Sequence, residues 1–194
     1  MARPQLFDRS TVLTQALNVF WRKGYDGASI QDLVDATGLN RGSLYNSFGD
    51  KDELFAEVML VYRSLSPTKI LTNASATADV SQLFQDFFQI LVDRAEQDPD
   101  HKGCLMTNTA AGFYGCSESM ADWVCESLDG LESLFVRLIE RGQEFDDISS
   151  TTDPIKLARF LVAAAQGMNV MARTGADVSV LQDIADQTLQ ALNP

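Results

Sequence analysis

The residues best suited to chemistry lie in one short run, NRGSLYNSFGDK, at positions 40–51. Its polar side chains are hydrogen-bond donors, and no carboxylate appears before Asp50. Leu44 and Phe48 are four residues apart, so on a helix they would share one buried face and leave the other positions exposed. The major groove of duplex DNA is about 12 Å wide and admits such a helix. The run therefore predicts a recognition helix with these outward residues: Arg41, Gly42, Ser43, Tyr45 and Asn46.

Helical periodicity before this run predicts the elements that hold it in place. Apolar residues recur three or four apart over residues 13–20, as on a core-facing helix. A second helix is expected to open at Ser29, with Asp32 completing a capping box, and to end in a turn at Gly38. Asn40 can cap the recognition helix. The order helix, turn, helix predicts a helix-turn-helix; Ser29 and Asn40 have the alternative role of simple caps.

Lys51 opens the next predicted helix, where the helix dipole disfavours a cation. A phosphate bound at this helix start would account for the lysine, because backbone N–H groups and the ammonium both attract the anion. Ser29 can offer its hydroxyl in the same way, and Arg3 lies on an N-terminal arm within reach of the adjoining minor groove. The alternatives are that Lys51 is a solvated charge and that Arg3 is disordered.

The net charge of the 194-residue chain is −12, which at first argues against a nucleic-acid partner. The charge is unevenly distributed, however: residues 1–50 hold five basic and five acidic side chains, whereas residues 51–194 hold ten and 22. Salt screens exposed charges beyond roughly 8–10 Å, so an acidic body held farther away than this need not prevent a neutral head from binding DNA. The sequence predicts two regions, 1–50 and 51–194.

Several other classes of protein are disfavoured. No apolar run reaches the length of a membrane span and no signal peptide is evident, so we expect a cytoplasmic protein without a membrane partner. Three cysteines at these spacings indicate neither a disulfide framework nor a zinc site. With one histidine and no phosphate-binding loop, we expect no metal, no cofactor and no enzyme. A pair formed by His101 and Cys104 is the catalytic alternative left open.

The remaining sequence is patterned for helices, and no segment shows sustained alternation of apolar and polar residues. The sequence thus predicts an all-α fold of about nine helices with essentially no sheet. A connector is expected around Pro67. The helices expected after it cover residues 79–97, 103–115 and 117–144, a segment from Pro154, and a last segment, ADVSVLQDIADQTLQAL.

The segment ALNVFWRKGYDGASIQDLVDATGLNRGSLYNSFGDKDELFAEVM resembles the N-terminal domain of TetR/AcrR-type transcriptional regulators. The resemblance covers about 50 residues, and the rest of the chain matches the family in length and helicity only. It implies a homodimer with a helix-turn-helix head, residues 1–50, that binds palindromic operator DNA, usually to repress. By position, phosphate contacts would fall to Ser29, Ser43, Tyr45 and Lys51, and base-edge contacts to Arg41, Gly42 and Asn46.

Two positions depart from the family pattern. Residue 49 is glycine where many members have proline, and Ser29 stands where threonine is common. The run NRGSLYNSFGDK resembles one subgroup, so the departures leave only the operator sequence open.

The resemblance also implies an effector-binding and dimerisation domain over residues 51–194. Large apolar side chains are frequent in residues 79–171, and most are expected to be core. We expect a subset to line a largely apolar cavity for a small apolar or electrophilic effector: Phe88, Cys104, Met106, Phe113, Trp123 and Met168.

Cys104 follows Lys102 at the start of a predicted helix, and a helix N-terminus and a nearby cation both favour a reactive thiolate. The segment HKGCLMTNTA is similar to one found in a subgroup that includes sensors of electrophiles and oxidants. The alternative is a small buried apolar residue. Cys125, inside a helix, is expected to be core.

The last two predicted helices carry many small side chains, including Ala163, Ala164, Ala165 and Gly167. Residues Leu181, Ala185, Thr188 and Leu192 follow at helical spacing. These residues predict packing against a symmetry mate in a four-helix bundle, which agrees with the dimers of the family. The alternative is a seam inside one chain. A second alternative, for the whole protein, is an effector-binding or interaction module of the same fold that does not bind DNA.

Overall fold

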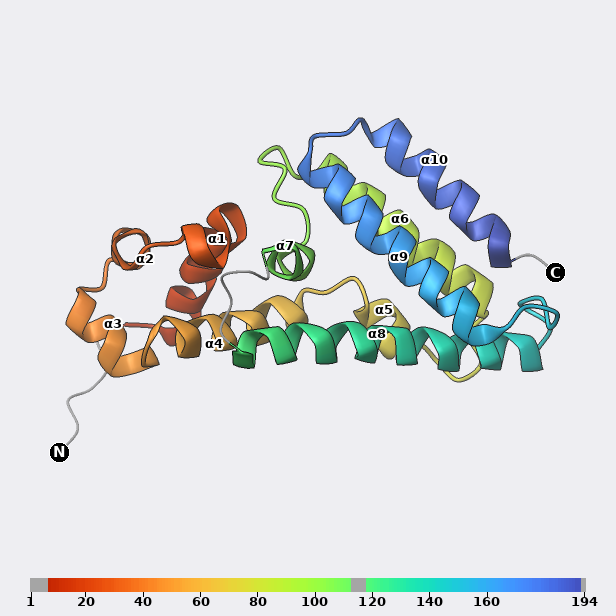
Figure 1. The fold of residues 1–194 in the computed structure, drawn as a ribbon, viewed down its shortest axis with the longest axis horizontal. Helices are drawn as coiled ribbons and strands as arrows, with labels where there is room; N and C mark the ends of the chain where they lie inside the picture. The colour runs from red at the N-terminus through yellow and green to blue at the C-terminus, as the bar shows by residue number, and fades with distance from the viewer. Residues whose placement is uncertain (1–6, 113–117, 193–194) are drawn as a thin grey trace. The chain divides into compact units, whose positions relative to one another are not determined.

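A computed structural model describes residues 7–112 and 118–192 of the chain, without the side chains of residues 118–121. These ranges contain ten α-helices, one short 3-10 helix and no strand (Figure 1), which confirms the all-α prediction. The helices are α1 (Arg9–Gly27), α2 (Ile30–Thr37), α3 (Arg41–Phe48), α4 (Lys51–Ser64), α5 (Lys69–Thr72), α6 (Val80–Glu96), α7 (Leu105–Ala111), α8 (Glu118–Glu144), α9 (Pro154–Arg173), α10 (Val178–Leu189) and the 3-10 helix Gln190–Leu192.

The chain folds into two compact units: Met1–Ser66 with Asn108–Asp122, and Pro67–Thr107 with Trp123–Pro194. The first unit includes α4, whereas the boundary expected after residue 50 assigned this helix to the second region. The difference arises because α4 packs along α1. Its apolar face completes the core of the first unit with these buried residues: Leu54, Phe55, Val58, Met59 and Tyr62.

Aromatic contacts hold α1 against α4. The Phe20 and Phe55 rings meet edge to face with centroids 4.8 Å apart, and the Trp21 and Tyr62 rings do the same at 5.0 Å. Gly24 interrupts α1 with a φ of 72°, a value that glycine adopts without strain. The kink is followed by one more turn, so the residues after Gly24 are redirected instead of continuing the straight helix.

The second unit is built around α6, α9 and α10, which lie side by side (Figure 1). Phe135 of α8 inserts against α6, with ring centroids 5.1 Å from Phe84 and 5.5 Å from Phe87. This unit therefore has its own continuous apolar core and does not depend on the first unit for one.

Two predictions about the second unit are wrong. The stripe expected to pack against a symmetry mate is buried in the core of its own chain: Leu181, Ala185, Thr188 and Leu192. The reason is that this side of α10 faces α6 and α9. Cys125 is exposed on α8 and not part of the core, since the helix turns Val124 inward instead.

Candidate nucleic-acid interface

The ends of α2 and α3 are capped as the sequence predicts. The Ser29 hydroxyl accepts a hydrogen bond from the Asp32 N–H at 3.1 Å, and the Asp32 carboxylate accepts one from the Ser29 N–H at 3.0 Å. Gly38 ends α2 in the left-handed conformation with φ 67°. The Asn40 side-chain oxygen then accepts from the Ser43 N–H at 2.9 Å and starts α3. These caps define two short helices joined by a tight turn.

The inner face of α3 is fixed by Leu44 and Phe48, both buried as predicted. Its outer residues are open to solvent: Arg41, Gly42 and Asn46 are exposed, and Ser43 and Tyr45 are half-buried. The Arg41 guanidinium lies 5.6 Å from the centre of the Tyr45 ring. Within the described chain, no hydrogen bond is made by the side-chain donors of four of these residues: Arg41, Ser43, Tyr45 and Asn46.

Arg9 anchors the C-terminal end of α3. One guanidinium nitrogen donates to the Ser47 carbonyl at 2.7 Å, and another pairs with Glu57 at 2.5 Å. The same guanidinium lies 4.2 Å from the centre of the Phe48 ring. Arg9 thus connects α1, α3 and α4, a role that its charge alone did not reveal in the sequence. It lies close to its partners only in the folded head, so no spacing rule predicts this contact.

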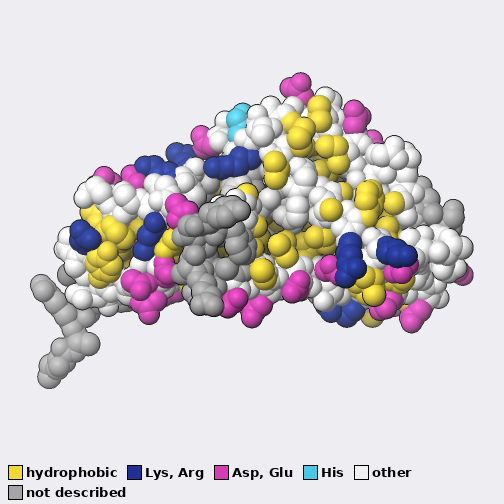
Figure 2. All heavy atoms as spheres, in the orientation of Figure 1, with side chains coloured by type: hydrophobic (Ala, Val, Ile, Leu, Met, Phe, Trp, Pro, Cys, Tyr) yellow, Lys and Arg dark blue, Asp and Glu magenta, His cyan; other side chains and the backbone are white. Residues whose placement is uncertain are grey.

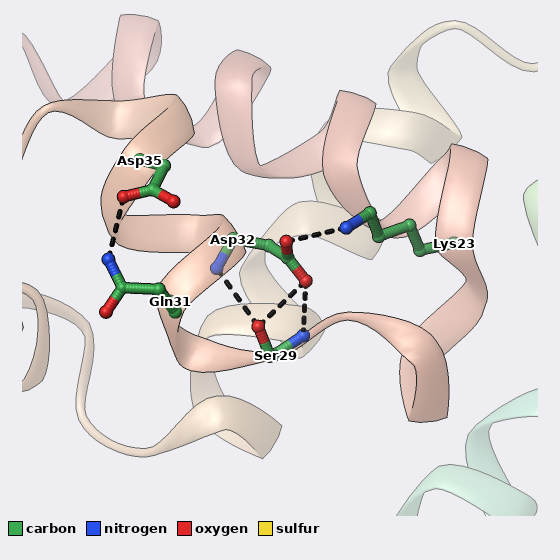
Figure 3. A network of polar contacts seen from close by, with 5 residues as sticks. All are labelled: Lys23, Ser29, Gln31, Asp32 and Asp35. Atoms are coloured by element: carbon green, nitrogen blue, oxygen red, sulfur yellow. Dashed lines mark hydrogen bonds and ion pairs between the residues drawn. The ribbon is translucent and has the colours of Figure 1, made fainter.

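A second internal network surrounds the start of α2 (Figure 3). The Lys23 ammonium contacts the Asp32 carboxylate at 2.6 Å, and the Ser29 hydroxyl donates to the same carboxylate at 2.8 Å. Gln31 donates to Asp35 at 2.7 Å on the same helix. Because both donors of Ser29 are directed at Asp32, a phosphate at Ser29 would have to compete with this carboxylate.

The Lys23 hydrogen bond is the main cause that lowers the pKa of Asp32 to about 2, and the bonds from Ser29 add to the effect. The folded-state pKa is below the ordinary value of 3.8, so the unfolded chain binds the proton more readily. The network therefore stabilises the head above that ordinary pKa, and this contribution is lost as the pH falls toward 2.

Lys51 begins α4 next to the predicted capping box. The Asp50 carboxylate accepts from the Glu53 N–H at 2.9 Å, and Glu53 accepts from the Asp50 N–H at 3.0 Å. The Lys51 ammonium lies 4.3 Å from the centre of the Tyr25 ring. Burial lowers the pKa of Lys51, and the negative charge of Asp26 partly opposes this shift.

The structure describes five of the six residues predicted for the effector site, and they differ in burial. Phe88 and Met168 are buried in the core of the second unit, whereas Cys104, Met106 and Trp123 are half-buried. Phe113 lies outside the described residues. The arrangement of these side chains around an effector stays a prediction.

One groove of about 460 Å³ lies between α6 and α10. Its lining is polar and includes none of the predicted effector residues that the structure describes; it comprises Gln82, Gln85, Asp86, Gln89, Gln182, Ala185, Asp186, Leu189 and Gln190. Among the described residues, no group of three or more His, Cys, Asp or Glu is arranged to hold a metal ion. No helix in those ranges is long and apolar enough to cross a membrane.

Comparison with known proteins agrees with this geometry. Residues 12–58 match the family of bacterial regulatory proteins called the tetR family, and residues 80–188 match the tetracyclin repressor-like C-terminal domain. The chain is 30% identical to the uncharacterised HTH-type transcriptional regulator YezE of Bacillus subtilis, with all of both chains covered. It is also 30% identical to the HTH-type transcriptional repressor ComR of Escherichia coli, with 97% of this chain and 90% of ComR covered.

Among solved structures, the fold is similar to a cysteine mutant of the TetR family regulator CifR in complex with a 26-base-pair double-strand operator DNA. The two chains are 30% identical, the TM-score is 0.85, and the match covers 97% of this chain and 99% of the other. Matches over both the head and the C-terminal domain identify a regulator and not an enzyme. The chain belongs to the tetR family of DNA-binding transcriptional regulators.

Proposed function

We propose that this regulator represses transcription by binding a palindromic operator as a homodimer, with one α3 in each of two successive major grooves. The observation that carries the proposal is the outer face of α3, whose donors have no partner in the described protein while Leu44 and Phe48 pin its inner face. A protein surface with this many unused donors is suited to a ligand rich in acceptors, as DNA is.

Within this proposal the head residues divide into two groups. Arg41, Gly42 and Asn46 lie at the exposed start and middle of α3, where side chains of a recognition helix reach base edges. Ser43, Tyr45 and Lys51 would contact phosphates, together with Ser29 if DNA displaces its bonds to Asp32. Asn40 caps α3 through its oxygen, and its amide N–H groups make no hydrogen bond in the described chain.

The proposed dimer interface uses the last two helices, with Ala163 and Gly167 of the predicted residues but without the buried stripe of Leu181, Ala185, Thr188 and Leu192. The outer face of α9 exposes Phe160, Ala163, Gly167, Val170 and Met171, and α10 exposes Val180. Figure 2 shows hydrophobic side chains at the surface over α9 and α10. A face of this kind, with small residues between large apolar ones, allows two helices to approach closely in a symmetric bundle.

A small apolar or electrophilic effector would act on the second unit, near Cys104 and Met106. Cys104 is half-buried and follows Gly103, which lies close to α9, and this position supports this part of the proposal.

The proposal is tested by selecting bound fragments from a random DNA pool, which returns the half-site and its spacing together. Arg41→Ala should then weaken binding to the selected operator by roughly 1–3 kcal/mol per half-site and relax the preference at one base pair in each half-site. The measurement is a titration of the same variant on the selected operator and on an unrelated duplex.

Lys51→Ala is the matched control, because loss of a phosphate contact weakens all sequences similarly and lowers the salt slope by about one for each of the two heads. Equal losses on both duplexes for Arg41→Ala would contradict its assignment as a base reader. Recovery of no fragment at all would favour a module of the same fold that does not bind DNA.

A further inference from the structure

The kink at Gly24 places a tyrosine between the end of α1 and the start of α4. The Tyr25 ring meets the Phe55 ring edge to face at 5.1 Å and lies parallel to the Phe20 ring at 6.2 Å. Its hydroxyl donates a hydrogen bond to the Asp52 carboxylate. The ring is therefore held on one side by the core of the head and at its edge by α4.

The Lys51 ammonium lies over this fixed ring, 4.3 Å from its centre. The negative face of an aromatic ring attracts a cation without neutralising it. In the described part of the chain, the Lys51 ammonium has no carboxylate within 4.0 Å, although Asp52 and Glu53 follow it directly. Both neighbouring carboxylates are occupied, Asp52 by the Tyr25 hydroxyl and Glu53 by the Asp50 N–H.

In this arrangement the Lys51 ammonium remains charged without forming an ion pair in the described chain. Burial against the ring lowers the pKa of Lys51, so the charged form is held at some cost in the free protein. An anion arriving at the start of α4 would offset that cost, because it would add to the partial effect of the Asp26 charge on the ammonium.

We propose that Tyr25 is a positioning residue for DNA binding, whose ring holds the Lys51 ammonium at the start of α4 so that it meets a DNA phosphate. The inference rests on the proposed operator binding and adds one residue to it. Tyr25 touches no DNA in this scheme; it acts through Lys51. Without the ring, the lysine would sample many rotamers or pair with Asp52.

The test is the salt dependence of binding to the selected duplex for the full-length dimer. One phosphate contact contributes about 0.9 to the slope of log K against log salt concentration. Because the dimer carries two copies of this contact, Tyr25→Leu should lower the slope by about 1.8, as Lys51→Ala does, and the double variant should show no further decrease. Tyr25→Phe keeps the ring and should keep the slope of the wild type.

Tyr62→Leu is the matched control, since it removes a buried tyrosine ring from the same unit away from Lys51. It should destabilise the head without changing the slope. If Tyr25→Leu fails to fold, Tyr25→Met, which also lacks a ring, takes its place in the same comparison. A second measurement needs no variant: the ε-methylene protons of Lys51 should resonate upfield of other lysines because of the ring current.

The outcomes separate the inference from the function on which it rests. A wild-type slope in folded Tyr25→Leu, while Lys51→Ala lowers the slope, would overturn the role of Tyr25 and leave operator binding intact. Additive decreases in the double variant, or an unshifted Lys51 resonance, would do the same. A Lys51→Ala slope equal to that of the wild type would refute Lys51 as a phosphate contact and the inference with it.

Discussion

At the scale of residues, the described cations of the head differ in the kind of partner that they contact. Arg9 and Lys23 pair with the carboxylates of Glu57 and Asp32 and so hold the unit together. Arg41 and Lys51 instead contact tyrosine rings and have no ion pair in the described chain. An aromatic ring can orient a cation while leaving its charge available. The two cations assigned to DNA thus contact aromatic rings and, within the described chain, form no ion pair with a carboxylate.

Cys104 offers a prediction at the same scale. It follows Gly103, where an added Cβ would lie 3.0 Å from the Asn169 carbonyl and 3.1 Å from Arg173 Cβ on α9. The loop has little room there, so an adduct on the neighbouring thiol should displace it from α9. Cys104→Ser should stay bound to the operator at concentrations of a mild electrophile that release the wild type, measured by fluorescence anisotropy of labelled operator.

Cys125→Ser provides the control, because Cys125 is exposed on α8 and should not affect release. If Cys104→Ser and the wild type were released by the same concentration of electrophile, a sensing role for Cys104 would be refuted.

At the scale of elements, a glycine at position 42 makes α3 less stable as a helix but, in the proposed complex, leaves room for DNA to approach its backbone. An added Cβ would meet only the Asn40 side-chain oxygen, at an ordinary 3.4 Å. Gly42→Ala should therefore be tolerated and raise the free energy of unfolding by at most about 1 kcal/mol. It should also weaken operator binding by at least about tenfold, or 1.4 kcal/mol, because the methyl group would stand between α3 and the groove. Chemical unfolding and operator titration give the two quantities.

Gly130→Ala on α8 is the matched control, since nothing lies within 4 Å of an added Cβ there. It should gain a similar amount of stability and leave operator affinity unchanged. Unchanged operator affinity for Gly42→Ala would show that DNA does not approach this backbone closely.

The corner between α3 and α4 explains the departure from the family pattern at residue 49. Gly49 has a φ of 75°, and an added Cβ would overlap the Glu53 side chain that completes the α4 capping box. Proline is fixed near φ −65° and does not adopt this conformation. Glycine at this corner and the box formed by Asp50 and Glu53 are thus parts of one local structure.

At the scale of the whole molecule, the proposed dimer depends on the exposed face of α9. Phe160 is 48% exposed and Val170 49% in the single chain. Phe160→Glu should weaken the dimer at least about tenfold, because it would bury a charge without a partner. Operator affinity should fall with it, since two heads on one dimer bind two half-sites together. Sedimentation equilibrium measures the first effect and operator titration the second.

Phe145→Glu is the control, because Phe145 is 65% exposed but follows α8 and does not belong to this face. It should leave the dimer intact. A Phe160→Glu protein that remained dimeric at nanomolar concentration would require a different interface.

Much of the fold could be predicted from the sequence because its signals are local. The caps at Ser29, Asn40 and Asp50 follow from side chains that bond to backbone only three residues away. Leu44 and Phe48 could be assigned to the buried face of α3 because they are four apart on one short helix. The boundaries of α6 and α8 were also close to those expected, since apolar periodicity extends over several turns.

What the sequence by itself determined, then, is where helices begin and end and which side chains share a face. Only the tertiary structure decided which neighbour each face meets. The stripe on α10 has the spacing of an interface whether it packs on another chain or, as here, on α6. The contacts of Arg9 with Glu57 and of Tyr25 with Lys51 join residues 48 and 26 positions apart. Periodicity describes one helix at a time, whereas such contacts exist only once the helices have packed against one another.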